Sequence, residues 1–212
     1  MQPIKIVFLL CAFVLFTAEA AAPKLFSEGI IKYDVYVNAS SKPDGIYVVS
    51  VKGSQIKREL AMNSGYNNVT IYNSKTGNML SIDMSNDMKY ALEMSPEEIK
   101  EKNKRFDGAV ITPLDDTKKI AGYRCVSSKV TYTNSASATF YYTTDLLPQN
   151  ENINTMFPSL QGIPLEYEIK NANSINMRFV ATVVDIQSVE SAVFAIPADY
   201  KIVSKAELEK IK

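Results

Sequence analysis

Apolar and polar residues alternate along most of the chain from Glu28 onward. This period of two is typical of β-strands, because successive side chains of a strand point to opposite faces. In the first such segment, Ile31, Tyr33 and Val35 share one face. The charged Lys32 falls on the other face, so we expect a strand with one buried and one exposed side.

Similar segments follow at short intervals, and residues that favour turns separate them. The further predicted strands span residues 46–51, 54–60, 67–73, 78–84, 88–94, 123–132, 137–144, 163–171 and 175–187. About eight to ten strands joined by hairpin turns predict a mainly β fold, with a single antiparallel sheet that is strongly curved or partly closed. The last of these hairpins is expected to turn at residues 171–174.

The clearest hairpin spans residues 78–94. With residues 85–87 as its loop, three apolar residues before the loop lie opposite three after it, and cross-strand partners share a face. The predicted pairs are Met84 with Met88, Ile82 with Tyr90, and Leu80 with Leu92. Methionine adapts to irregular partners, so this face could bind a hydrophobic ligand, and ordinary core packing is the alternative.

Two short helices are predicted from their capping residues. Ser95 and Glu98 form a capping box at the start of a helix that ends before Gly108. Ser204 and Glu207 repeat this spacing near the C-terminus. We expect these short helices to cover the sheet.

Two connections lack a strand pattern. Asp115 and Asp116 are expected to lie in a turn. The Pro- and Asn-bearing segment 145–161 is expected to hold a short helix around residues 153–157.

The N-terminal residues have the pattern of a secretory signal peptide. Lys5 precedes an unbroken apolar run, residues 6–16, which is too short to span a bilayer. Ala18 and Ala20 supply the small residues of a cleavage site. We therefore expect cleavage after Ala20 and a mature single domain over residues 21–212, without a transmembrane segment.

Charge and composition exclude several partners and chemistries. Removal of residues 1–20 takes away one of the 23 basic and one of the 23 acidic residues, so the charge stays balanced. A balanced charge gives no general attraction to nucleic acid or to an anionic membrane. The chain has no His, which excludes Ser-His-Asp and Cys-His catalysis and removes the usual zinc ligand. No motif indicates a cofactor.

Two remaining features could carry chemistry. Glu166 and Glu168 share a strand face, as a general acid and base would, and two solvated glutamates are the alternative. Cys125 is the one thiol outside the leader, and its possible roles are nucleophile, metal ligand or small buried side chain. No His or second Cys can lower its pKa, and Arg124 should point to the opposite face. We therefore expect Cys125 to be a packing residue and the protein not to be an enzyme.

Five segments occur in an order that is shared with a known family. They are EGIIKYDVYV (28–37), IAGYRCVSSKVTY (120–132), FYYTTDLLP (140–148), LQGIPLEYEI (160–169) and FAIPADYK (194–201). Together they resemble exported Bacteroidota proteins of unknown function that are related to the GLPGLI proteins. The resemblance implies a fold similar to that of the lipoprotein carrier LolA and its receptor LolB, a half-open antiparallel barrel with helices over an apolar concavity.

These patterns lead to one interpretation and one alternative. We interpret the chain as an exported protein of the bacterial envelope, periplasmic or secreted, that binds a lipid or a lipoprotein acyl chain in an apolar concavity. The predicted hairpin face at residues 80–92 would line that concavity. The alternative is a non-catalytic structural or protein-interaction module whose concavity is filled by its own side chains.

Overall fold

The computed structural model describes residues 22–85, 87–170 and 176–211. The predicted leader at 1–20 and the predicted turn at 171–174 lie outside the described residues.

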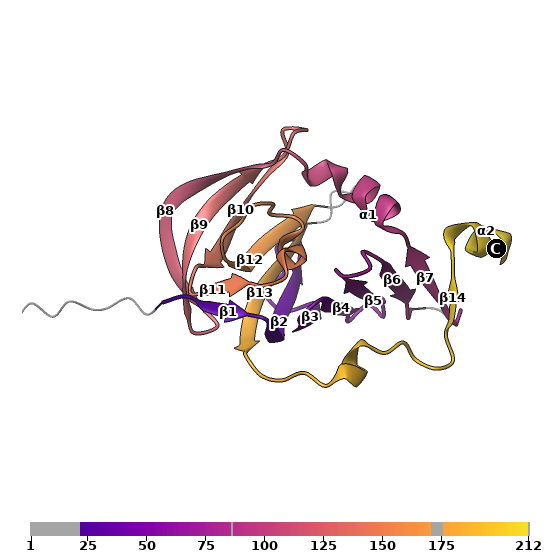
Figure 1. Cartoon of the computed structure of the whole chain (residues 1–212). Helices are drawn as coiled ribbons and strands as arrows, with labels where there is room; N and C mark the ends of the chain where they lie inside the picture. Colours follow the sequence, from indigo (N-terminus) through magenta and orange to yellow (C-terminus); the bar gives the residue numbers. More distant parts are fainter. Residues whose placement is uncertain (1–21, 86, 171–175, 212) are drawn as a thin grey trace, which may run out of the picture.

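Twelve strands form one curved sheet that does not close into a barrel (Figure 1), which confirms the predicted mainly β fold. In order across the sheet they are β14 (Lys201–Val203), β7 (Tyr90–Met94), β6 (Met79–Asp83), β5 (Asn67–Asn73), β4 (Gln55–Met62), β3 (Gly45–Lys52), β2 (Glu28–Val37), β13 (Asn176–Asp185), β12 (Ile163–Lys170), β10 (Ser137–Thr143), β9 (Tyr123–Thr131) and β8 (Val110–Ile120). Neighbouring strands are antiparallel except β14, which runs parallel to β7. The sheet is therefore mixed rather than purely antiparallel.

The alternation predicted for the first long strand is confirmed in β2. Ile31, Tyr33 and Val35 are buried, and Lys32 is exposed. Apolar side chains on one parity therefore fix which face of β2 packs against the core.

The predicted turn at Asp115 and Asp116 is wrong, because both residues lie within β8. The pairing of β8 with β9 shifts between Pro113 and Thr117. The strand therefore bulges at these two aspartates and then continues, which increases its local bend. The hydroxyl of Tyr141 in β10 donates a hydrogen bond to the Asp116 carboxylate beside this bulge.

The connection after β10 also differs from the prediction. It contains a short strand, β11 (Leu146–Pro148), which pairs in parallel with β1 (Lys24–Phe26). The helix in this connection is the 3-10 helix η2 (Glu151–Asn154), which begins two residues before the predicted range of 153–157.

The two predicted capping boxes are confirmed. α1 (Pro96–Asn103) begins after Ser95, whose side chain accepts the Glu98 N–H, and the Glu98 carboxylate accepts the Ser95 N–H. The chain continues as the 3-10 helix η1 (Lys104–Phe106). The same reciprocal bonds join Ser204 and Glu207 at the start of α2 (Lys205–Ile211).

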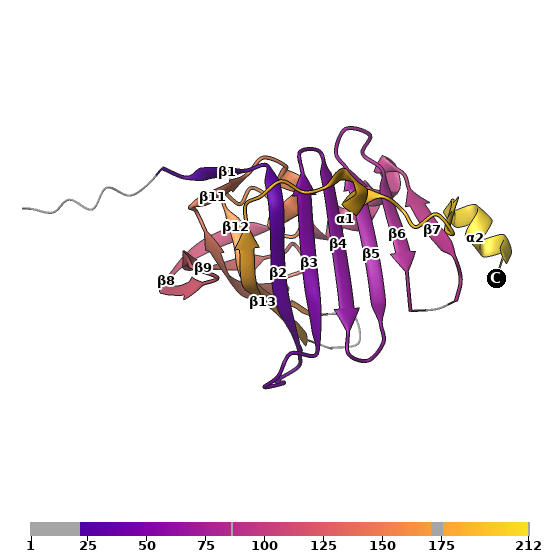
Figure 2. The ribbon, with the colours of Figure 1, turned by 90° about the horizontal axis from the view of Figure 1, so that it is seen from below.

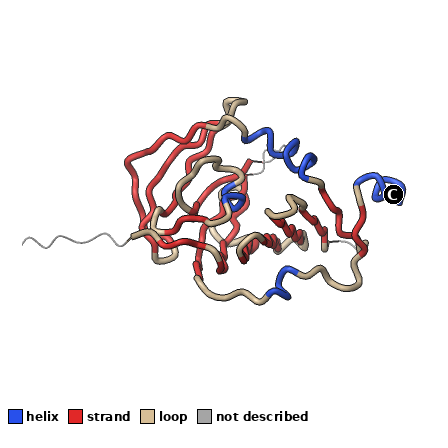
Figure 3. The backbone as a smooth tube through the Cα atoms, viewed as in Figure 1, coloured by secondary structure: helices blue, strands red, loops and turns tan. Residues whose placement is uncertain are grey.

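Both faces of the sheet are covered (Figures 1 and 2). On the inner face of the bend, α1, η1 and the η2 connection lie over the sheet. On the outer face, the segment 186–200 crosses β2 to β7 and carries the 3-10 helix η3 (Ser191–Phe194). The larger hydrophobic core lies on the inner side, and a smaller one lies beneath η3. Figure 3 shows the same arrangement by secondary structure, with short helices on both sides of the strands.

Candidate ligand-binding site

The β6–β7 hairpin has a register one residue away from the predicted one. Ile82 pairs with Ala91 rather than with Tyr90, and the predicted pair Leu80–Leu92 is shifted in the same way. A shift of one residue moves side chains to the opposite face of a sheet. The prediction that six apolar residues share one face is therefore wrong.

The strand residues of this set divide between the two faces. Leu80 and Ile82 face the outer side, where Ile82 is 1% exposed and belongs to the core beneath η3. Tyr90 and Leu92 have the opposite parity, face the inner side and are half-buried. The four side chains cannot line one concavity.

The two methionines of the set lie in the connection between the strands. Met84 and Met88 are 40% and 43% exposed. The connection spans residues 84–89, longer than the predicted loop. The Asp83 carboxylate accepts the N–H of Ser85 at 2.9 Å, which turns the chain directly after β6.

Cover on both faces explains the wrong register. The predicted pairing assumed that one face of the hairpin carries the apolar side chains and that the other meets solvent. In the structure, Val189 and Phe194 cover the outer face, and α1 lies on the inner side. Apolar residues therefore occur at both parities of β6 and β7, and the hydrophobic pattern is compatible with either register.

The inner face of the sheet bounds a cavity of about 240 Å³, which we call the inner cavity. Tyr47 and Met79 line it from the sheet, and Ile99 and Phe106 line it from α1 and η1. Met156, in the connection after η2, lines a third side. The inner cavity therefore lies between the sheet and its cover.

A row of aromatic rings crosses the middle of the inner face, from β10 to β3. Successive ring centroids lie between 4.4 and 5.7 Å apart. In order, the rings belong to Phe140, Phe157, Tyr167, Phe179, Tyr47 and Tyr33. Phe157 comes from the η2 connection, so the chain itself fills part of the concavity and leaves the inner cavity beside it.

One half-buried cation lies among these rings. The Nη2 atom of Arg58 donates a 2.6 Å hydrogen bond to the carbonyl oxygen of Asn152. Burial raises the pKa of Tyr33, Tyr47 and Tyr167, and the Arg58 charge partly opposes this rise. The three phenols are therefore neutral at physiological pH, and Arg58 is the charged group on the floor of the inner cavity.

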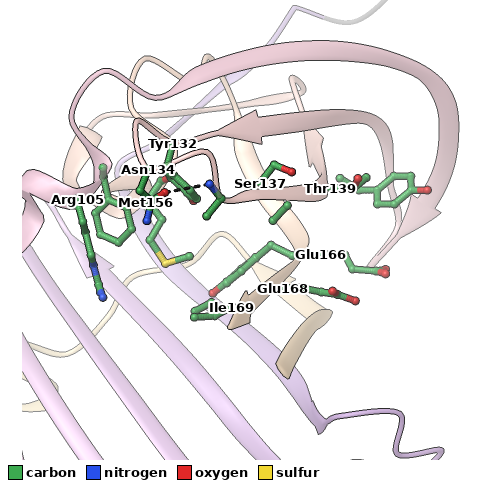
Figure 4. A pocket seen from close by; sticks show the side chains of 14 residues that line it. Arg105, Tyr132, Asn134, Ser137, Thr139, Met156, Glu166, Glu168 and Ile169 are labelled. Atoms are coloured by element: carbon green, nitrogen blue, oxygen red, sulfur yellow. Dashed lines mark hydrogen bonds between the residues drawn. The ribbon is translucent and has the colours of Figure 1, made fainter. Parts of the chain in front are cut away.

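A second cavity of about 490 Å³ lies between β10 and β12 (Figure 4), and we call it the strand slot. These strands pair only from Tyr141 to Thr143, with a register shift between Tyr141 and Tyr142. Beyond that point they separate, and residues 136–139 and 166–169 line the two sides of the slot. Consecutive residues on each side show that the slot borders strand edges as well as side chains.

The inner cavity and the strand slot are adjacent. Both are lined by Arg105, Phe106, Met156 and Tyr167. The two spaces therefore adjoin at these four residues.

Glu166 and Glu168, which were considered both as an acid–base pair and as solvated side chains, lie along the strand slot. Glu166 is paired with Lys118 at 2.6 Å and with Arg178 at 3.5 Å, and its side chain is 15% exposed. Glu168 accepts a hydrogen bond from the Asn176 amide at 3.0 Å. Glu166 is thus held in an ion-pair network instead of being a solvated side chain.

Cys125 is fully buried, as expected for a packing residue. Its Sγ lies 3.7 Å from the carbonyl oxygen of Tyr123. Burial raises the pKa of the thiol to about 11, so almost none of it is the reactive thiolate at neutral pH.

The inner cavity was not predicted from the sequence, although one signal for it was present. Ile56, Arg58 and Leu60 share one parity of β4, so a cation occupies a position on an otherwise apolar face. A charge on the core face of a strand is unusual and indicates a paired or functional residue.

Two further properties concern the described part of the chain. His, Cys, Asp and Glu side chains form no group of three or more there that could hold a metal ion. None of its helices is long and apolar enough to cross a membrane.

Comparison with known proteins gives the fold and no family. No family model matches the chain, and no curated protein matches it significantly. The family resemblance of the five segments therefore stays a prediction.

Several solved structures match part of this chain, and the fold likeness rests on a match with a TM-score above 0.5. An uncharacterised conserved protein from Thermus thermophilus has a TM-score of 0.51 at 8% identity, over 84% of this chain and 91% of that one. PNGF-II has a TM-score of 0.48 at 17% identity, over 86% of this chain and 32% of that one. MucB, which has also been solved in complex with MucA from Pseudomonas aeruginosa, has a TM-score of 0.38 at 10% identity, over 84% of this chain and 60% of that one. This chain therefore spans less than two thirds of PNGF-II and of MucB. The match to the Thermus thermophilus protein, at 8% identity, shows a shared fold alone.

Proposed function

We propose that the protein is a non-catalytic binding protein of the cell envelope that holds a hydrophobic ligand in the inner cavity. The observation that carries this proposal is the mainly apolar space of about 240 Å³ between the sheet and α1–η1. Small-molecule sites are usually concave, mainly apolar and furnished with a few polar groups.

The cover over the inner cavity is loosely packed, which supports entry of a ligand. No residue of α1 or η1 is fully buried. Ile99 and Phe106 are half-buried and line the cavity instead of filling it. A ligand in this space would bury these two side chains further, so binding and closure of the cover would be coupled.

The adjacent strand slot would extend the site. A chain that passes Phe106 and Met156 would reach a further space of about 490 Å³. Elongated apolar ligands, such as acyl chains, match this geometry better than compact ones do. The predicted signal peptide would deliver the protein to the compartment where such chains are exchanged.

A neutral amphiphile tests the proposal directly. Decanol should bind saturably and raise the melting temperature as its concentration rises, because it binds only the folded state. Ile99→Trp should fill part of the inner cavity and weaken decanol binding by roughly tenfold, the effect of losing about 1.4 kcal/mol. Lys100→Trp is the matched control, since Lys100 is exposed on the same helix and does not line the cavity. Equal weakening in both variants, or no saturable binding in the wild type, would overturn the proposal.

A second candidate function is peptide binding at the strand slot, and the interrupted pairing of β10 with β12 favours it. If the Tyr141–Glu166 register continued, residues 138–140 would face residues 167–169. In the described chain, the paired register stops at Tyr141 and the two strand edges separate. An extended peptide could enter the slot and pair with one of these edges by strand addition.

The slot also specifies which peptide would fit. By their positions along the strands, Thr139 and Glu168 belong to one face of the sheet. Ile169 belongs to the other face, on the side of Met156. Among the described residues, no cation lies within 4.0 Å of the Glu168 carboxylate. The matching occupant alternates apolar and basic side chains, with a Lys or Arg opposite Glu168.

A Val-Lys-Val-Lys-Val peptide is the probe for this candidate. Glu168→Lys should weaken its binding by like-charge repulsion, and Glu209→Lys on the exposed face of α2 should not. The same peptide with N-methylated valines should bind less well, because it lacks backbone donors. Equal binding of the methylated and unmethylated peptides would contradict strand addition.

A further inference from the structure

The charged side chains that line the inner cavity are all positive. Arg58 on the floor, Lys102 on α1 and Arg105 on η1 all line it. Within the described residues, no Asp or Glu lines the same space. The whole chain carries equal numbers of basic and acidic residues. The excess of positive charge at the cavity therefore reflects where the fold places these side chains, not the composition of the chain.

None of the three cations has a carboxylate partner within 4.0 Å among the described residues. Arg58 is held by the Asn152 carbonyl, and Arg105 lies with its guanidinium carbon 4.6 Å from the ring centroid of Phe106. By contrast, the neighbouring Lys104, which does not line the cavity, is paired with Glu101 at 2.6 Å. The acidic Glu101 of α1 is therefore paired with a cation outside the cavity and not with Lys102 or Arg105.

Of the three cations, Arg58 is the least exposed to solvent. Arg58 is half-buried on β4, with Val49 of β3 and Thr70 of β5 as its cross-strand neighbours. A cation that is partly removed from water and lacks an anion is costly, and a bound anion would offset that cost. Lys102 and Arg105 are exposed, so they would meet a ligand at the mouth of the cavity.

We infer that the ligand of the inner cavity is an anionic amphiphile, whose carboxylate is bound by Arg58 with support from Lys102 and Arg105. The apolar chain of the ligand would lie against Met79, Ile99 and Phe106. This inference rests on the proposed function and adds the chemical class of the ligand. Arg suits the role because its planar guanidinium can bind a carboxylate through two parallel hydrogen bonds.

The test compares ligands that differ only in charge. Octanoate, decanoate and dodecanoate are each titrated beside the corresponding methyl ester by calorimetry and thermal shift. The acid should bind about ten- to a hundredfold more tightly than its ester, which is the usual range for hydrogen bonds to a charged group. Added salt should weaken binding of the acid and leave binding of the ester unchanged.

Substitutions locate the anion site. Arg58→Met should remove most of the preference for the acid, and Arg58→Lys should retain part of it. Because Arg58→Met also breaks the bond to Asn152, Lys102→Gln with Arg105→Gln serves as a second variant at exposed positions. That pair should reduce the preference by several-fold, whereas the control Lys100→Gln should leave it unchanged.

The outcomes separate this inference from the proposed function. Equal binding of acid and ester, with both saturable, would overturn the anion site and leave the hydrophobic cavity in place. Binding of neither would overturn the proposed function itself. An acid preference that persists in the folded Arg58→Met variant and in the Lys102→Gln/Arg105→Gln variant would place the anion elsewhere and contradict the inference.

Discussion

The carboxylate of Glu28 accepts a hydrogen bond from the backbone N–H of Val189 at 2.7 Å. The two residues are 161 positions apart in the chain. Lys52 pairs with the same carboxylate at 3.0 Å, and the Ser188 hydroxyl donates to it at 3.2 Å. Glu28 therefore holds the segment 186–200 where it begins to cross the outer face of the sheet.

This arrangement predicts an acid-sensitive attachment. The Val189 N–H and Lys52 lower the pKa of Glu28 below its ordinary value of 4.5. A lowered folded-state pKa gives stabilisation that is present above about pH 4.5 and is lost as the pH falls through the lower, folded-state value. We expect the protection of the Val189 amide, its exchange rate relative to that of an unstructured peptide at the same pH, to fall across that range. Glu28→Gln should remove this pH dependence and lower the melting temperature at neutral pH, whereas the exposed Glu190→Gln should change neither.

The outer position of Ile82 predicts a change in stability without a change in binding. Ile82 is 1% exposed beneath η3, so Ile82→Ala should lower the free energy of unfolding by about 2–5 kcal/mol. Met84→Ala is the control, because Met84 is 40% exposed and such sites usually change stability by about 0.5 kcal/mol or less. Denaturant unfolding measures both effects. Decanol affinity should be unchanged in the folded Ile82→Ala protein, and a selective loss of it would place Ile82 in the ligand site after all.

The alternation of residues predicted strands such as β2 well because they have one clearly buried parity. Ile31, Tyr33 and Val35 show this in β2. The 11-residue strand β8 was missed because Ile120 is its one buried residue. The capping boxes at Ser95 and Ser204 were also predictable, since reciprocal side chain–backbone bonds depend on spacing within one turn.

The remaining features depend on contacts between distant segments. The register of β6 and β7 could not be predicted from the hairpin sequence. It depends on Val189 and Phe194, which cover Ile82 and lie more than 100 residues away in the chain. Asp115 and Asp116 resemble turn residues locally, and a bulge paired to β9 accommodates them. The inner cavity was missed because it forms where β2–β6, β12, α1–η1 and the η2 connection meet, and no short motif encodes that junction.

Burial of Cys125 predicts an inert thiol. With the pKa raised to about 11, the thiolate fraction near neutral pH is very small, and the side chain is shielded from solvent. A maleimide should label the native protein slowly and the denatured protein quickly. Cys125→Ser should lower the free energy of unfolding by about 1–3 kcal/mol by burying a hydroxyl, and ligand binding should not change. Fast labelling of the folded protein would instead indicate a reactive thiol.

Engineered disulfides can distinguish the observed register of the β6–β7 hairpin from the predicted one. Ser81 lies directly opposite Leu92, and directly opposed residues of antiparallel strands have Cα atoms about 4.5–5.5 Å apart, within the range of a disulfide. In a Cys125→Ala background, Ser81→Cys with Leu92→Cys should therefore cross-link on mild oxidation. Ile82→Cys with Tyr90→Cys should not, because those side chains lie on opposite faces of the sheet. Thiol counting and peptide mapping by mass spectrometry after oxidation measure both, and the reverse pattern would restore the predicted register and the shared face of Leu80, Ile82, Tyr90 and Leu92.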